Sequence, residues 1–483
     1  MGGAKIKENP HIRNCDYDRL SKSPVQRHVK KHAARKLQLL EHRPTSNLHQ
    51  LRIRGRFFNN MTGFNQPGAF QGKTYTINLD SKRKDYVFPG RKRNSRTSVL
   101  LMRYNSAIKH GKIVIPMRKE AHMLYQLMNK DVVVATYKEE KDFDNYTYVE
   151  VERFDDYLPF GFLTMDDWID GRQIAKQRAS IEKLMRELGL ITRHDFISMA
   201  RCLSLTDTFW MKREDEDLLW DEVSLYTNPF DDVIARVAFD GTGMYGRQNS
   251  PTSPEFATSG SFAKCWIREG DQIFLLKRGS DGYVNAGFEP YSEKLASDLL
   301  AAARIDHVPY EIVHYHDKLA CKCPLFTSED IGFVSAHRFF DRPFSLSEMM
   351  KFAAEHNAEE ALREMVVMDA IIANVDRHAG NYGFMVDNKT GEILRMAPLF
   401  DQNMACLPLM METDDFDAYL NMIGPKIGTD FVAFAREMLT SSIHAKLIEL
   451  KDFEYQDPGF GYPKWKLNTV NHLKDVQISA ILA

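Results

Sequence analysis

The stretch of residues 368–402 constrains what this chain can fold into and do more than any other part of the sequence. An apolar segment with helical spacing ends at Asn374, and a polar loop follows in which Asp376 and Asn381 are five positions apart. Two β-type segments joined by an Asn- and Gly-containing turn come next, which predicts a hairpin. The second strand delivers Asp401. Two acids and one amide are therefore expected to meet where the loop joins the hairpin.

These three residue types suit metal-assisted phosphoryl transfer. In that chemistry one Asp accepts the proton of the attacking hydroxyl, while an Asn and a second Asp hold the Mg²⁺ that neutralises the phosphates. The pattern assigns Asp376 as the catalytic base, and Asn381 and Asp401 as the residues that hold the metal. An Asp and an Asn at this spacing are common in surface loops, so the prediction rests on the whole series of helix, loop, hairpin and final Asp.

The segment N-V-D-R-H-A-G-N, followed by A-P-L-F-D, resembles the catalytic segment of HipA-like kinases, bacterial Ser/Thr kinases often found as toxins in toxin–antitoxin pairs. The resemblance implies an α+β, two-lobed protein-kinase-like fold with an antiparallel β N-lobe and an α-helical C-lobe. It also implies ATP and Mg²⁺ as cofactors, a protein substrate with Ser or Thr, and an antitoxin protein as a partner. Val375 stands where ordinary protein kinases have the Arg of H-R-D, and Asp401-Gln402-Asn403 replaces D-F-G.

A small-residue loop and the hairpin after it predict the phosphate-binding half of the site. Backbone N–H groups of such loops approach phosphates closely, so Ser259, Gly260 and Ser261 are expected to contact them. The resemblance implies that Ser259 or Ser261 can be self-phosphorylated. The hairpin ends on Lys277, which by resemblance contacts the phosphates and pairs with Glu293 in the next helix. Glu293 could instead only favour the N-terminus of that helix through the macrodipole.

Three further strands are expected between residues 308 and 337, all in the N-lobe sheet. The last of them leads into a hinge with a basic, aromatic and acidic tail, similar to the hinge of HipA-like proteins. By resemblance, the backbone of Ala336, His337 and Arg338 hydrogen-bonds the adenine. In the catalytic loop, Arg377 and His378 could contact phosphate or order the loop. His378 is also an alternative base, which the spacing of the Asp and Asn disfavours.

Charge divides the chain into two unlike parts. Residues 1–120 carry 27 Lys and Arg against 7 Asp and Glu, whereas the remainder carries 37 against 59. Such a basic arm could bind nucleic acid by neutralising phosphates and stacking aromatic side chains on bases. A solvated, partly disordered extension explains the same composition and is favoured, because clustered basic residues without a binding fold are most often tails.

Changes in composition and pattern along the sequence divide the chain into four expected parts. We expect a basic N-terminal extension at residues 1–122, a HipA-like N-terminal subdomain at 123–250, the nucleotide-binding part of the N-lobe at 251–340 and the helical C-lobe at 341–483. Residues 431–450 are expected to form one amphipathic helix that closes the C-lobe. No apolar run reaches the roughly 18 residues of a membrane span, so a soluble, cytoplasmic protein without a membrane partner is expected. Its six scattered cysteines are expected to be reduced.

Three other functions fit the same residues. The first is a small-molecule or phosphoinositide kinase of the same fold, which would have the same catalytic loop. The second is an inactive nucleotide-binding module whose basic arm tethers DNA or an antitoxin. The third is a nucleic-acid-binding protein whose active part is residues 1–120. Transfer of phosphate to a Ser or Thr of a protein remains the favoured prediction.

Overall fold

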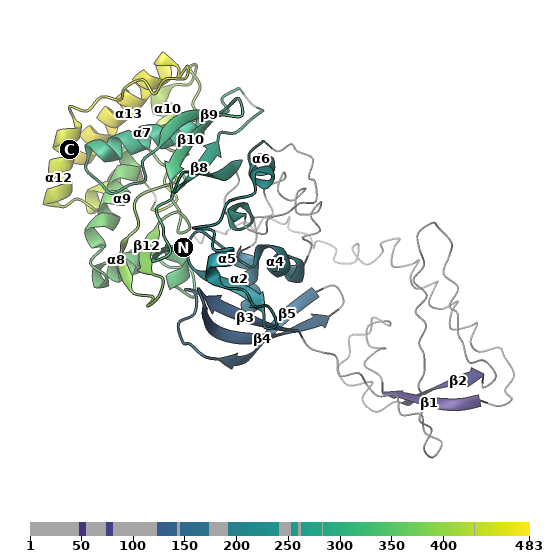
Figure 1. Cartoon of the computed structure of the whole chain (residues 1–483). Helices are drawn as coiled ribbons and strands as arrows, with labels where there is room; N and C mark the ends of the chain where they lie inside the picture. The colour runs from purple at the N-terminus through teal and green to yellow at the C-terminus, as the bar shows by residue number, and fades with distance from the viewer. Residues whose placement is uncertain are drawn as a thin grey trace, which may run out of the picture. The chain divides into compact units, whose positions relative to one another are not determined.

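The computed structural model describes residues 48–54, 74–80, 123–142, 145–172, 192–240, 253–258, 262–282, 284–428 and 430–483. The chain divides into two compact units, residues 1–114 and 115–483. In the first unit, strand β1 (Leu48–Arg54) pairs antiparallel with strand β2 (Thr74–Asp80) (Figure 1). The rest of the predicted basic extension lies outside the described residues.

The second unit begins with a four-stranded antiparallel sheet in the order β5-β4-β3-β6. Its strands are β3 (Leu124–Asn129), β4 (Val132–Asp142), β5 (Asn145–Arg153) and β6 (Phe209–Arg213). Alternating apolar side chains of these strands bury one face against two helices, α2 (Met165–Arg172) and α4 (Arg193–Ala200). Two shorter helices follow, α5 (Trp220–Val223) and α6 (Asp232–Asp240). We call this part the N-terminal subdomain.

A second four-stranded antiparallel sheet has the order β7-β8-β10-β9 and forms the N-lobe. After the short helix η2 (Pro254–Ala257) come β7 (Lys264–Glu269) and β8 (Gln272–Arg278), which are joined at Gly270. Gly270 has a φ of +61°, which suits a residue without a Cβ. Helix α7 (Glu289–Ala302) then packs against β10 (Lys318–Pro324) and β9 (Glu311–Tyr315).

The third sheet corrects one prediction. Strand β11 (Ile331–Ser335) was expected in the N-lobe sheet, but it pairs with β12 (Gly383–Asp387), which in turn pairs with β13 (Ile393–Met396). The hairpin predicted from the sequence is therefore present, and β11 adds a third strand to it. Gly383 permits this close pairing, since a Cβ there would lie 2.1 Å from the carbonyl oxygen of Val334.

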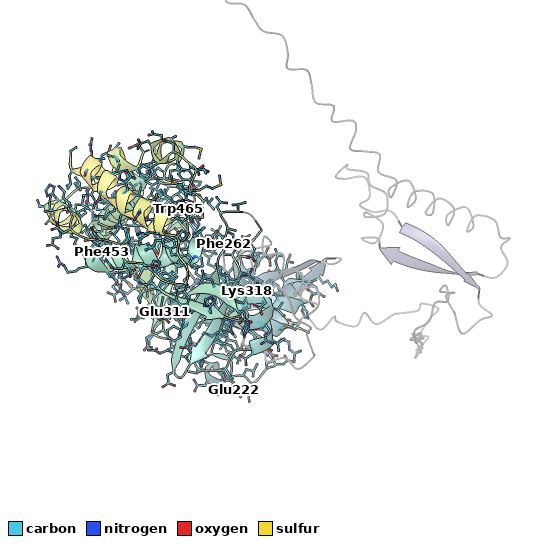
Figure 2. The ribbon with its side chains drawn as sticks, turned by 90° about the horizontal axis from the view of Figure 1, so that it is seen from above. Glu222, Phe262, Glu311, Lys318, Phe453 and Trp465 are labelled. Carbon is cyan, nitrogen blue, oxygen red and sulfur yellow. The ribbon has the colours of Figure 1, made fainter. Side chains whose placement is uncertain are left out.

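The C-lobe is helical, as predicted. Its helices are α8 (Leu346–Glu355), α9 (Glu359–Ile371), α10 (Phe416–Met422), α11 (Phe431–Glu437), α12 (Ser441–Leu450) and α13 (Lys464–Leu482) (Figure 1). Apolar side chains of these helices and of α7 form one large core, and side chains fill the space between the ribbons (Figure 2).

The single helix expected at residues 431–450 is in fact two helices, α11 and α12. The break occurs because Thr440 takes an extended backbone conformation and its side chain accepts a hydrogen bond from the N–H of Ile443 at 3.2 Å. Threonine favours this N-cap position, where it satisfies a backbone N–H that has no partner within the helix. Apolar periodicity runs through both helices and did not reveal the cap.

Two features of the described residues bear on their surroundings. None of their helices combines the length and apolar character needed to cross a membrane. All the cysteines among them are free and buried, which fits the predicted reduced thiols: Cys202, Cys265, Cys321, Cys323 and Cys406.

Candidate active site

A buried ion pair between a strand and the following helix forms the centre of the site. The Nζ of Lys277, at the end of β8, donates a hydrogen bond to Oε1 of Glu293 in the first turns of α7. The same Nζ donates to Oδ1 of Asp401 at 2.5 Å. Lys277 and Glu293 are 5% and 0% exposed, so neither charge is balanced by water. The predicted pairing of Lys277 with Glu293 is therefore present in the structure.

The ionisation of this group follows from burial and from the neighbouring charges. Burial opposes ionisation of Asp401, but the ammonium groups of Lys277 and Lys264 hold its pKa well below its usual range. Burial disfavours the charged form of Lys277, yet Asp401 and Glu293 together raise its pKa. Burial raises the pKa of Glu293, against the opposing effect of Lys277. The surroundings therefore favour the ionised form of Asp401 more strongly than that of Glu293.

A buried arginine holds the catalytic loop in place. Arg377 donates from Nε and Nη2 to the two carboxylate oxygens of Asp369 in α9, at 2.7 and 3.0 Å. Its Nη1 donates to the carbonyl oxygens of Asn381 and Phe400 at 2.9 and 2.8 Å. Four bonds from one guanidinium thus join the supporting helix, the loop and the strand leading to Asp401. Of the two roles that the sequence left open for Arg377, contacting phosphate or ordering the loop, the structure shows the second.

Asp376 and Asn381 lie on one tight loop, as their spacing predicted. The side chain of Asn381 donates from Nδ2 to the carbonyl oxygen of Asp376 at 3.1 Å and accepts at Oδ1 from the N–H of His378 at 2.9 Å. Nδ1 of His378 accepts from the N–H of Gly380 at 3.0 Å. Asp376 keeps a partly exposed carboxylate, which accepts a hydrogen bond from Lys426. His378 therefore orders the loop, while Asp376 presents an acidic side chain to its surroundings.

A cavity of about 470 Å³ is lined by six of the twelve predicted site residues, and the predicted base Asp376 is not among its lining residues. Lys277, Asn381, Asp401 and His378 line it, and apolar side chains of the N-lobe form much of its remaining wall. Lys264 also lines it and was missed as a site residue. It lies directly opposite Lys277 in the β7–β8 pairing and is 7% exposed. Counting back from the hairpin turn would have placed it there, because antiparallel register fixes cross-strand neighbours.

The backbone prediction for the hinge needs a correction. The N–H of Ala336 donates to the carbonyl oxygen of Tyr382 at 2.9 Å, and that of His337 donates to Ala379 at 3.1 Å. Both amides therefore fasten the end of β11 to the catalytic loop and do not point at an adenine site. The side chains of His337 and Arg338 still line the cavity, whereas Ala336 is fully buried.

The segment that follows β10 is the better candidate for the adenine contact. Cys323 lies opposite Leu275, two residues before Lys277, and both line the cavity. The chain then passes Leu325, Phe326 and Thr327, which line the same cavity as they leave the sheet. A nucleotide whose phosphates meet Lys277 would thus extend its base toward this segment. Sequence reasoning placed the hinge one strand too late because β11 was assigned to the wrong sheet.

The N-terminal subdomain also contributes a wall of the cavity. Phe160, Arg172 and Thr206 belong to this subdomain and line the cavity. Arg172 is held by Asp207 at 2.5 Å, and the side chain of Arg338 lies against Gly171. The subdomain therefore forms part of the wall of the site, which the sequence analysis did not predict.

The predicted phosphate-binding loop and the predicted metal site differ in how far the structure describes them. Ser259, Gly260 and Ser261 lie outside the described residues, so their phosphate contacts stay predictions. Among the described residues, no group of three or more His, Cys, Asp or Glu side chains is arranged to hold a metal ion. Asp401 and Asn381 nevertheless offer hard oxygen donors to one cavity. This set fits Mg²⁺, which is bound through one or two carboxylates together with substrate phosphates and water.

The strand lysine paired with a helix glutamate, beside an Asn and an Asp that face the same cavity, is the arrangement of a protein-kinase-like site on an α+β fold. No protein-family model matches the chain, and no curated protein matches it.

The solved structures that resemble this chain include two neighbours at low identity. One is HipA of Shewanella oneidensis MR-1, from a complex of the toxin–antitoxin system with HipB and its operator DNA. It has a TM-score of 0.43 and 12% identity, over 74% of this chain and 96% of that chain. The other is the Helicobacter pylori proinflammatory kinase CtkA. Its TM-score is 0.38 and its identity 14%, over 46% of this chain and 88% of that chain.

Proposed function

We propose that this protein is an ATP- and Mg²⁺-dependent kinase that transfers the γ-phosphoryl group to a Ser or Thr hydroxyl of a protein. The observation that carries the proposal is the convergence of the Lys277–Glu293 pair, Asp401 and Asn381 on one cavity, with Asp376 on the same loop. Positioning and charge stabilisation supply most of the catalysis in this class, and these side chains provide both.

Each side chain has a distinct task in this proposal. Lys277 and Lys264 bind and orient the phosphates, and Glu293 fixes the position of Lys277. Asp401 and Asn381 hold Mg²⁺, which neutralises charge on the phosphates. Asp376 accepts the proton of the attacking hydroxyl as its oxygen bonds to the γ-phosphorus and the bond to the ADP oxygen breaks. Removing a general base of this kind costs about 10²- to 10⁴-fold in rate.

The test is transfer of labelled γ-phosphate from ATP by the full chain, with and without Mg²⁺. Wild type is compared with Asp376→Asn, Asp401→Asn and a matched control, Asp475→Asn, whose carboxylate is 61% exposed on α13. Calorimetric titration with a non-hydrolysable ATP analogue is run in parallel. We expect Mg²⁺-dependent labelling that both site variants lose and the control keeps, with nucleotide binding retained in Asp376→Asn.

The same experiment separates the alternatives. Nucleotide binding by wild type without any transfer would contradict the kinase and favour an inactive nucleotide-binding module. Transfer to phosphoinositide or to a small alcohol, but to no protein, would show that the acceptor is a lipid or a small molecule and not a protein. The antitoxin partner and nucleic-acid binding by residues 1–120 stay predictions, which a pull-down and a salt-dependent DNA titration would test.

A further inference from the structure

We infer that Lys426 is a further catalytic residue, which holds Asp376 and also contacts the phosphoryl group during transfer. The inference rests on the proposed kinase function and assigns to this reaction a residue far from the catalytic loop in sequence. Lys426 lies in the segment between α10 and α11, and its Nζ donates a hydrogen bond to Oδ1 of Asp376.

This ion pair contributes little to the stability of the fold. The side chains of Lys426 and Asp376 are 53% and 32% exposed, and exposed ion pairs contribute little to stability. The loop is already fixed from inside by Arg377 and by the two side-chain hydrogen bonds of Asn381. An exposed ammonium on the carboxylate that serves as base therefore matters for chemistry more than for folding.

The catalytic loop itself lacks a cation that could meet the transferred group. Within residues 374–381 the permanently charged cation is Arg377, which is 2% exposed. Its N–H groups already donate hydrogen bonds to Asp369 and to two carbonyl oxygens. His378 is tied to its own loop through Gly380 and Asn381. Lys426 supplies the missing positive charge from outside the loop.

The surroundings of Lys426 place it where an acceptor would arrive. Together with Ile427 and Gly428 it lines an open groove of about 810 Å³, whose other side includes Phe340 and Phe344. His337 and His378 line both this groove and the nucleotide cavity, so the two spaces adjoin. A hydroxyl entering through the groove would pass Lys426, whose ammonium group holds Asp376.

The chemistry of the step explains why a cation is needed beside the base. The hydroxyl oxygen forms a bond to the γ-phosphorus, its proton passes to Asp376, and the bond to the ADP oxygen breaks with the electron pair leaving on ADP. An ionised carboxylate repels the negative oxygens of the phosphoryl group, whose charge is spread over three equatorial positions. An ammonium has three N–H donors, so Lys426 can keep one on Asp376 and direct another to a phosphoryl oxygen.

The test compares Lys426→Met, Lys426→Arg and a control, Lys138→Met, in the full chain. Lys138 forms a surface pair with Glu140, remote from the catalytic loop in sequence, at 3.0 Å. The measurements are kcat and KM for phosphate transfer, the Kd of a non-hydrolysable ATP analogue, and the midpoint of urea unfolding. We expect Lys426→Met to lower kcat by about 10²- to 10³-fold, the effect of losing one charge-stabilising donor. Nucleotide Kd and unfolding should match wild type, and Lys426→Arg should recover part of the rate.

Three outcomes would overturn the inference. One is a wild-type kcat in Lys426→Met, and another is an equal loss in Lys138→Met. The third is a loss of activity that follows a lowered unfolding midpoint, which would make Lys426 structural. Failure of the proposed function is a different result, because wild type itself would then transfer no phosphate.

Discussion

Glu293 accepts a hydrogen bond from the backbone N–H of Gln402 at 2.8 Å, while its other carboxylate oxygen accepts one from Lys277. The glutamate thus ties helix α7 both to the phosphate-contacting lysine and to the residue after Asp401. Asp401 has a φ of +62°, a left-handed conformation that costs a non-glycine residue energy. The bond from Gln402 helps to hold the chain in that conformation, so the helix position and the metal-site geometry are set by one side chain.

Replacing Lys277 tests this arrangement directly. Lys277→Met leaves the carboxyl groups of Glu293 and Asp401 buried without their common cation, and breaking a buried pair in this way costs about 3–5 kcal/mol. We expect that loss in the free energy of unfolding by urea, together with loss of nucleotide binding by calorimetry. The control is Lys322→Met on β10, whose partners Glu269 and Glu311 are exposed. A loss of equal size in the control would contradict the assignment.

The buried Arg377–Asp369 pair should be the strongest stabilising ion pair of the C-lobe. Arg377→Ala removes four hydrogen bonds and leaves Asp369 buried, so we expect about 3–5 kcal/mol of destabilisation. Arg377→Lys should recover only part of this, since an ammonium cannot make the bidentate contact. Arg395→Ala is the control, because its pair with Asp306 is more than half exposed on both sides. Similar unfolding midpoints for Arg377→Ala and wild type would rule the idea out.

The close pairing of β11 and β12 makes Gly383 sensitive to any side chain. Gly383→Ala would place a Cβ 2.1 Å from the carbonyl oxygen of Val334 and 2.7 Å from the Cα of Ser335. Neither backbone atom can move away without separating the strands, so we expect about 1–3 kcal/mol of destabilisation in urea unfolding. Gly424→Ala is the matched control, because a Cβ there meets no atom within 4 Å. Tolerance of both substitutions would show that the strands pair more loosely.

A pH-dependent contribution to stability is expected from Lys466 on α13. Burial lowers the pKa of its ammonium to about 8, although it donates to the carbonyl oxygens of Leu407, Pro408 and Met410. In the unfolded chain the group titrates near its ordinary value of about 10.4, so between these values the unfolded state binds more protons. Stability linked to this group therefore rises with pH across that window.

The measurement is urea unfolding of wild type and Lys466→Met at pH values of about 7.5 and 9.5, which bracket the lower part of the window. The wild type should gain stability relative to the variant as pH rises. A difference between the two proteins that does not change with pH would show that Lys466 titrates normally in the fold.

Local patterns predicted the catalytic loop well. The spacing of residues within one short stretch of the sequence was enough to assign Asp376, Asn381 and Asp401. The structure brings Asn381 and Asp401 to one cavity. The pairing of Lys277 with Glu293 was expected only from the resemblance to HipA-like kinases, because periodicity locates the strand and the helix but does not select an ion pair between them.

Contacts between distant segments could not be predicted in the same way. The alternation of apolar and polar residues identified β11 as a strand, but it carries no information on the strand with which β11 pairs. That pairing was therefore misassigned, and the adenine contact with it. Lys426 reaches Asp376 across fifty positions, and a lone lysine in a loop has no pattern. The contribution of Phe160 and Thr206 to the cavity likewise depends on the docking of two sheets, which no local signal encodes.

Under the proposed kinase function, the pairing of β11 with β12 has a consequence for turnover. The chain leaves the N-lobe sheet at Pro324 and joins the catalytic sheet at Ile331, so residues 325–330 carry the connection. Both ends of this connection are fastened, by the N–H of Leu325 to Ile273 and by that of Ser328 to Ile331, each at 2.8 Å. Any rotation of one sheet against the other must be absorbed by the few dihedral angles between those anchors. The stiffness of that short span would then govern how quickly spent nucleotide departs, and with it the pace of each cycle.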